Sequence, residues 1–111
     1  MAKTVVNEHG GKQAAINERL DLIPPEALLR VGSILAKGME KYGKDNWRLI
    51  SRREHIAHAL RHLYLYLAIE DGTLREDDEE YEDHLGNAAC RVLFAISKLI
   101  EDGYEMRSEG A

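Results

Sequence analysis

The sequence predicts an all-α fold, and three observations lead to that prediction. Apolar residues recur at intervals of three and four over three segments of about 15 to 20 residues, which is the pattern of amphipathic helices. Residues that start and stop helices lie at the ends of each segment. No stretch alternates apolar and polar residues as a half-buried strand would. At 111 residues, the chain has room for one domain, 1–111, with one modest core.

The first helix is predicted over residues 25–42. Pro25 suits the first turn of a helix, where its missing amide hydrogen is not needed, and Glu26 suits the positive end of the helix dipole. Gly43 then supplies a stop. Residues 1–20 show no sustained apolar period, so we expect an N-terminal arm with at most a short extended piece.

Two further helices are predicted, over residues 52–70 and 82–101. Ser51, followed by Glu54 three residues later, has the sequence pattern of an N-terminal capping box. Gly103 follows the apolar residues of the third helix and provides its stop. Three amphipathic helices without a strand pattern indicate an α-helical bundle.

The charge of the chain is concentrated in one segment. The chain has 15 basic and 20 acidic residues, a net charge of −5, and nine of the acids lie in residues 70–83 beside one base. Because like charges repel, we expect a loop as far as about residue 81, and we expect residues 104–111 to form a flexible tail. The acidic balance argues against a nucleic-acid partner and against binding to an anionic membrane surface.

The sequence shows no sign of export. No apolar run approaches the ~18 to 20 residues that span a bilayer, and the N-terminal stretch lacks the apolar core of a signal peptide. The single cysteine, Cys90, lies among small apolar residues, so we expect an inert, buried side chain and a cytoplasmic location. A domain this small buries only about two thirds of its surface, so we expect a homodimer or a higher homo-oligomer.

Three histidines, His55, His58 and His62, are aligned along one side of the second predicted helix. A pair four residues apart, such as His58 and His62, is able to bind a divalent metal ion. Solvated or hydrogen-bonded histidines are the commoner alternative. The chain contains no HExxH and no CxxC motif, so a zinc hydrolase has little support.

Acidic residues near two helix ends predict a cation site. Glu70 closes the second predicted helix, and Asp83 and His84 lie at the start of the third. If these helices pack antiparallel, their short connection brings Glu70 and Asp83 across a common cleft. Such carboxylates attract Mg²⁺ or Mn²⁺, which also bridge to substrate phosphates, although an acidic run is more often a solvated surface.

Basic and aromatic residues elsewhere suit a nucleotide. Lys12, Arg19 and Lys41 are candidate counter-charges for a triphosphate, with ordinary surface solubility as the alternative. The only tryptophan, Trp47, lies in a polar turn beside Asn46. Trp47 can stack on a base whose edge Asn46 reads, or it can cap the core from its loop.

Five strings in register resemble the phage-associated, MazG-like dATP/dGTP diphosphohydrolases of the MazZ type. They span residues 10–100, in this order: Gly10-Gly11-Lys12, Arg19-Leu20-Asp21-Leu22-Ile23-Pro24-Pro25, Lys41-Tyr42-Gly43 with Asn46-Trp47, Ala59-Leu60-Arg61-His62-Leu63, and Asp83-His84-Leu85 with Ala88-Ala89-Cys90. The resemblance implies a MazG-like helical bundle completed by oligomerisation. It also implies a pyrophosphohydrolase that releases pyrophosphate from purine deoxynucleoside triphosphates with Mg²⁺ or Mn²⁺. In some phages of this kind, the enzyme removes dATP and converts dGTP to dGMP, a precursor of 2-aminoadenine DNA.

The resemblance also implies roles for particular residues. Those expected to bind substrate are Lys12, Arg19, Lys41, Asn46, Trp47 and Arg61. Those expected to surround the metals are Glu70, Asp83, His84 and His62, of which His62, Glu70 and Asp83 are expected to be catalytic. The better-known MazG pattern has ExxE on one helix and ExxD on the next; this chain offers Arg61-His62 and His84 to Asn87 in those stretches.

The expected reaction is direct attack of water on the α-phosphorus, because the chain has no P-loop and no nucleophile with an obvious base. A carboxylate or His62 would take the proton. One alternative is a histidine-aspartate type phosphohydrolase, which would use His55, His58 or His62 with Asp71 or Asp83 and release intact triphosphate. Another is a non-catalytic helical interaction module.

Overall fold

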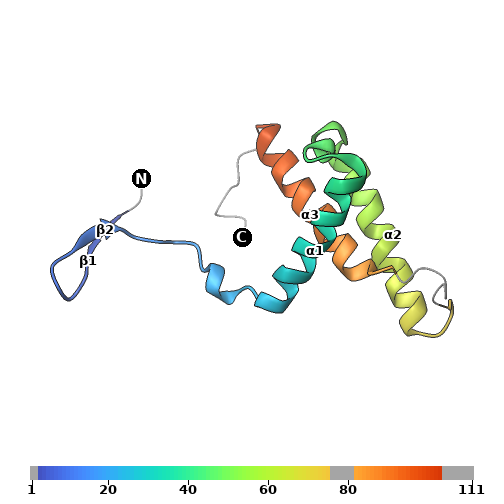
Figure 1. Ribbon diagram of the computed structural model, residues 1–111, viewed down its shortest axis with the longest axis horizontal. Coiled ribbons are helices and arrows are strands. Elements are labelled where there is room, and N and C mark those ends of the chain that lie inside the picture. Colours follow the sequence, from blue (N-terminus) through green and yellow to red (C-terminus); the bar gives the residue numbers. More distant parts are fainter. Residues whose placement is uncertain (1–2, 76–81, 104–111) are drawn as a thin grey trace.

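Three helices form the body of the protein (Figure 1). The computed structural model describes residues 3–75 and 82–103. The helices are α1 (Pro25–Tyr42), α2 (Arg52–Glu70) and α3 (His84–Glu101). They confirm the all-α prediction, and the bounds of α1 and α2 agree with those predicted. The predicted tail, residues 104–111, and residues 76–81 of the predicted acidic loop lie outside the described residues.

The ends of the helices follow from local side chains. The Ser51 hydroxyl accepts a hydrogen bond from the amide of Glu54 at 3.1 Å, as predicted for the start of α2. The start of α3 was predicted at residue 82, but the helix begins at His84. The physical reason is that the Asp83 carboxylate caps α3 by accepting from the amide of Gly86 at 2.9 Å.

Helix α3 packs against both of the other helices (Figure 1). It runs antiparallel to α2, because His62 meets His84 while His55, seven residues earlier, meets Arg91, seven residues later. On its other side, α3 approaches α1 closely at Gly86, which is buried. The central position of α3 places α1 and α2 against different faces of one helix.

The core of this body is small. Its buried apolar side chains are short: Ala59, Ala88, Cys90 and Ala95. The predicted burial of Cys90 is confirmed, and this burial raises the pKa of its thiol. Many larger apolar side chains on α2 and α3 are exposed instead. Within residues 3–75 and 82–103, no helix has both the length and the apolar character needed to cross a membrane.

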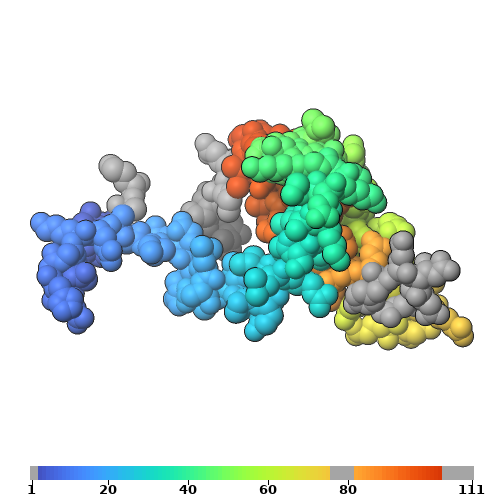
Figure 2. All heavy atoms as spheres, viewed as in Figure 1, coloured from blue at the N-terminus to red at the C-terminus, as the bar shows by residue number. Residues whose placement is uncertain are grey.

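The predicted N-terminal arm contains a β-hairpin that stands apart from the helices (Figures 1 and 2). Its strands β1 (Thr4–Val6) and β2 (Lys12–Ala14) are antiparallel. The Asn7 side chain closes the turn by accepting from the amide of Gly11 at 2.8 Å. A 3₁₀ turn, η1 (Leu20–Leu22), follows before α1. The expected short extended piece is therefore a hairpin of two three-residue strands.

Replacing Gly86 by alanine is expected to destabilise the fold by about 1–3 kcal/mol. A Cβ atom at this position would overlap the side chain of Ile34 on α1 and lie 2.7 Å from Oδ2 of Asp83, the residue that caps α3. Chemical denaturation measures the loss. Gly32→Ala is the matched control, because nothing lies within 4 Å of the added Cβ in α1. Its expected effect is a gain of about 0.4–1 kcal/mol. Equal stabilities of the two variants would contradict this account.

Candidate functional site

A cleft of about 1110 Å³ lies between α1, α3 and a 3₁₀ turn, η2 (Asn46–Leu49). Lys41, Asn46 and Trp47 line it where α1 ends and η2 follows. Glu82 and Asp83 line it where α3 begins. This volume is ample for a nucleotide. The cleft thus joins three of the residues predicted to bind substrate with one of the predicted metal ligands, Asp83.

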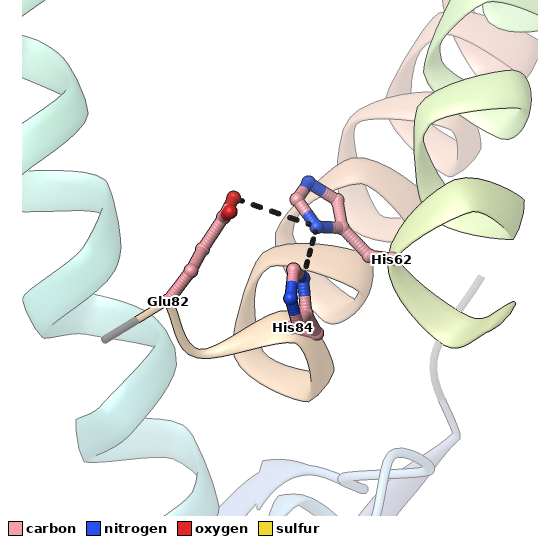
Figure 3. A group of neighbouring side chains, drawn as sticks. All are labelled: His62, Glu82 and His84. Atoms are coloured by element: carbon pink, nitrogen blue, oxygen red, sulfur yellow. Dashed lines mark hydrogen bonds and ion pairs between the residues drawn. The ribbon is translucent and has the colours of Figure 1, made fainter. Parts of the chain in front are cut away.

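Glu82 and Asp83 line one end of the cleft, which we call its acidic end. At this end, Glu82 forms a cluster of potential metal ligands with His62 and His84 (Figure 3). The Nδ1 atoms of His62 and His84 lie 3.0 Å apart, and Oε1 of Glu82 lies 3.6 Å from Nδ1 of His62. In Figure 3 the three side chains point toward one another. His62 comes from α2, His84 is the first residue of α3, and Glu82 lies two residues before α3. Glu82 belongs both to the cluster and to the cleft lining.

The fold brings these three side chains together through local features on both helices. His62 lies on the face of α2 that packs against α3, and it is only 7% exposed. His84 is the first residue of α3, directly after the capping residue Asp83. Asp83 also accepts a hydrogen bond from Arg30 of α1 at 3.1 Å. Asp83 therefore fixes the turn that holds Glu82 and His84 on either side of it.

The chemistry of the cluster fits a divalent cation. Burial lowers the pKa of His62 below its ordinary value of 6.5, and this effect outweighs the opposing effect of Glu82. His62 is therefore unprotonated at neutral pH, and a neutral imidazole can donate a lone pair to a metal. Two imidazole nitrogens and one carboxylate suit Mn²⁺ better than Mg²⁺, which prefers oxygen ligands. The same Nδ1 atoms can instead share one hydrogen bond.

Glu70 lies outside this cluster. His62 faces His84, the first residue of α3. Because the two helices are antiparallel, the part of α2 that follows His62 extends past the start of α3. Glu70 is eight residues further along α2, or about 12 Å along the helix axis, and its side chain is exposed. The structure therefore separates Glu70 from Asp83, which we expected to face each other across one cleft. The structure places Glu82 in the cluster instead. Glu82 was not singled out from the sequence, where the only indication was its acidic side chain two positions before His84.

Trp47 is packed against α3 rather than open to solvent. Its ring stacks on Phe94, with centroids 5.2 Å apart and planes at 5°, and the Arg48 guanidinium lies 4.5 Å from its centroid. Lys98 donates to the backbone carbonyl of Arg48 at 2.9 Å, which also ties η2 to α3. Trp47 thus caps the core, as one of its two predicted roles required, and still lines the cleft.

His55 fastens the η2 turn to the helices. It is completely buried, with 0% exposure. Its Nδ1 lies 3.2 Å from the Arg91 guanidinium, which can only donate, so Nδ1 accepts. Its Nε2 is then the protonated nitrogen, and it donates to the backbone carbonyl of Trp47 at 3.0 Å. Both nitrogens are occupied, so His55 is not available to a histidine-aspartate metal site. His58 and Asp71, also considered for such a site, are exposed.

The remaining predicted substrate-binding residues lie away from the cleft of their own chain. Lys12 is in β2 and Arg19 follows the hairpin, and both are exposed. The Arg19 guanidinium donates two hydrogen bonds to the Asp21 carboxylate, at 2.9 and 2.7 Å. Arg61 is exposed on α2. None of the three lines the cleft, whose lining residues begin at Arg30.

Comparison with known proteins adds an independent result. No curated protein and no solved structure matches the chain. A family model described as "dATP/dGTP diphosphohydrolase, N-terminal" matches residues 7–108. The match covers the three helices, the cleft and the His62–Glu82–His84 cluster. Because it covers most of the sequence, the chain belongs to the dATP/dGTP diphosphohydrolase family, in the part of that family described as N-terminal.

Proposed function

We propose that this protein hydrolyses the purine deoxynucleoside triphosphates dATP and dGTP to the monophosphate and pyrophosphate. The observation that carries the proposal is the continuity of one cleft. It joins residues suited to a nucleoside, Asn46 and Trp47, to a cluster suited to a divalent cation, through Glu82. The family description names the same two nucleotides.

Different residues of the cleft are proposed to bind the phosphates and to take part in hydrolysis. Lys41 and Arg91 line the cleft and supply positive charge for phosphate oxygens. Water attacks the α-phosphorus, the bond from that atom to the oxygen shared with the β-phosphorus breaks, and pyrophosphate leaves. Glu82 keeps a second carboxylate oxygen when one oxygen binds a cation, so it is the residue of the cluster that can take the proton released by water.

The proposed cofactor is Mg²⁺ or Mn²⁺, with Mn²⁺ favoured by the two imidazoles. His62, Glu82 and His84 would hold it. When bound, such a cation neutralises phosphate charge and lowers the pKa of water. Asp83 keeps the turn in place through Gly86 and Arg30 and is a positioning residue in this proposal.

We further propose that the protein works as a homodimer or a higher homo-oligomer. Leu60 and Leu67 on α2 are 62% and 55% exposed, and Ile96 and Ile100 on α3 are 46% and 56% exposed. Side chains of this size stabilise a protein when they are removed from water, and a second copy would cover them. The proposed setting is the cytoplasm of a phage-infected bacterium. There, removal of dATP and supply of dGMP would serve 2-aminoadenine DNA, without a nucleic-acid or membrane partner.

The proposal is tested by incubating the purified protein with each of the four deoxynucleoside triphosphates and either Mn²⁺ or Mg²⁺. We expect dAMP and dGMP with equimolar pyrophosphate, faster turnover with Mn²⁺, and much slower turnover of the pyrimidine nucleotides. Chromatography separates the products. Free phosphate as the first product would contradict the mechanism. Nucleoside with intact triphosphate would support the histidine-aspartate alternative instead.

A further inference from the structure

The described part of the N-terminal arm, residues 3–20, has a defined structure but little to pack against. The hydrogen bonds within residues 3–15 join the two strands and close their turn. Every residue from 3 to 24 is exposed except Ala15, which is half-buried. Figure 2 shows the hairpin as a separate lobe beside the helices. The described helices therefore provide no cover for the arm.

The exposed side chains of the arm indicate that it packs on another surface. Val6, Ile16 and Leu20 are 61%, 85% and 72% exposed. An isolated two-stranded hairpin is at best marginally stable in water, and strands of three residues are at the short end of the usual range. The family match begins at residue 7, so the turn and β2 belong to the domain. The arm is thus a part of the fold that has no packing partner among residues 21–75 and 82–103 of its own chain.

The path of the chain directs the arm away from its own cleft. The exposed Arg19–Asp21 ion pair, at 2.7 Å, and the η1 turn lie just before α1. On the N-terminal side of these residues, the chain runs away from the helices (Figure 1). Lys12 and Arg19 are carried on this arm, opposite in sign to Glu82 and Asp83 at the acidic end of the cleft. The arm therefore carries two cationic side chains, Lys12 and Arg19, that do not line the cleft of their own chain.

We propose that the arm of each copy docks on a second copy of the chain and carries Lys12 and Arg19 to the mouth of that copy's cleft. Reciprocal exchange of an identical element is a low-cost way to build a dimer, because both copies gain the same contacts. It removes the apolar residues of the arm from water and adds two phosphate-binding cations to each site. This inference rests on the proposed function for the role of the two cations, but the docking itself does not.

Complementation between inactive subunits tests the exchange. The double variant Lys12→Ala with Arg19→Ala and the variant His62→Ala are each expected to lose about 100-fold or more in kcat/KM for dGTP. Co-expressed and captured through two different tags, they should recover about half of wild-type activity, because each heterodimer contains one site that combines an intact arm with an intact cleft. The matched control pairs His62→Ala with His84→Ala, which damage the same cluster and should recover nothing.

A cross-linking experiment tests the docking without any activity. Lys12→Cys, labelled with a benzophenone maleimide, is mixed with isotopically heavy copies of the same chain and irradiated. Cys90 is 4% exposed, so the unsubstituted chain treated identically is the control for labelling. We expect light-to-heavy cross-links to residues around the cleft.

The outcomes separate this inference from the proposed function. Cross-links confined to one chain, no recovery in the mixed subunits, or a monomer in sedimentation would each overturn arm exchange. Hydrolysis of dGTP by the wild type would still stand in those cases. Light-to-heavy cross-links at the cleft without any hydrolysis would support the docking and overturn the proposed function.

Discussion

Replacing His62 by alanine is expected to abolish measurable hydrolysis of dGTP and to weaken Mn²⁺ binding. His62 contributes the buried nitrogen of the cluster, 3.0 Å from His84 and 3.6 Å from Glu82. Without it, only two donors remain, and we expect at least about a 100-fold loss of kcat/KM and a loss of similar size in metal affinity. Steady-state kinetics measure the first, and calorimetric titration with MnCl₂ measures the second.

Two further variants separate loss of the cluster from loss of the fold. His84→Ala should reproduce both defects, and because His84 is only half-buried it should cost less stability than His62→Ala. His58→Ala, on the same helix but exposed, should leave hydrolysis and Mn²⁺ binding unchanged. Full Mn²⁺ affinity in the His62 variant would refute the assignment of the cluster as the cation site.

Replacing His55 by alanine should cause the largest loss of stability among single substitutions. The change leaves a cavity in the core and removes the hydrogen-bond partners of Arg91 and of the Trp47 carbonyl. We expect a loss of about 2–4 kcal/mol, which lowers Tm by roughly 10–20 °C in a domain of this size. His55→Gln, which can still donate to a carbonyl, should lose less. Calorimetry measures these shifts, and a Tm for His55→Ala close to that of His58→Ala would contradict them.

The burial of His55 also makes the stability depend on pH. Burial is the largest cause that lowers the pKa of His55 below its ordinary value of 6.5, with Arg91 acting in the same direction. The unfolded chain therefore binds protons more readily than the folded protein between these two pKa values. The free energy of unfolding should be greatest above about pH 6.5 and should decrease as the pH falls toward 5.

Urea denaturation at pH 8, 7, 6 and 5 measures this dependence. The free energy of unfolding should change less with pH in His55→Ala than in the wild type. Some dependence should remain in that variant, because burial also lowers the pKa of His62. A wild-type protein that becomes more stable between pH 7 and pH 5 would show that His55 is not held neutral by the fold.

The helices could be predicted from the sequence because their signals are local. Apolar spacing and end residues such as Ser51 and Gly43 act within a few positions of the helix that they define. The hairpin could not be predicted in the same way, since its strands of three residues are too short to show a period. Its turn was visible only as a glycine-containing stretch, and Gly10 adopts a φ of +80° there.

The candidate site was harder to predict because it depends on the register between two helices. Asp83 and His84 were expected near the cations, but only the packing of α3 on α2 decides which residue of α2 they meet. Glu70 and His62 of α2 were both expected there, and of these two the structure places His62 against His84. An acidic run gives no signal for one member over another, so Glu82 could not be distinguished from its neighbours.

The ion pair between Arg30 and Asp83 links the two walls of the cleft at its acidic end. An incoming phosphate that contacts Arg30 must compete with a carboxylate already 3.1 Å away, so the ligand exchanges one ionic contact for another. A small anion that contacts Arg30 alone therefore gains little on entry. Retention of a ligand then depends on contacts made simultaneously at both ends of a longer molecule, which favours an intact nucleotide over its fragments.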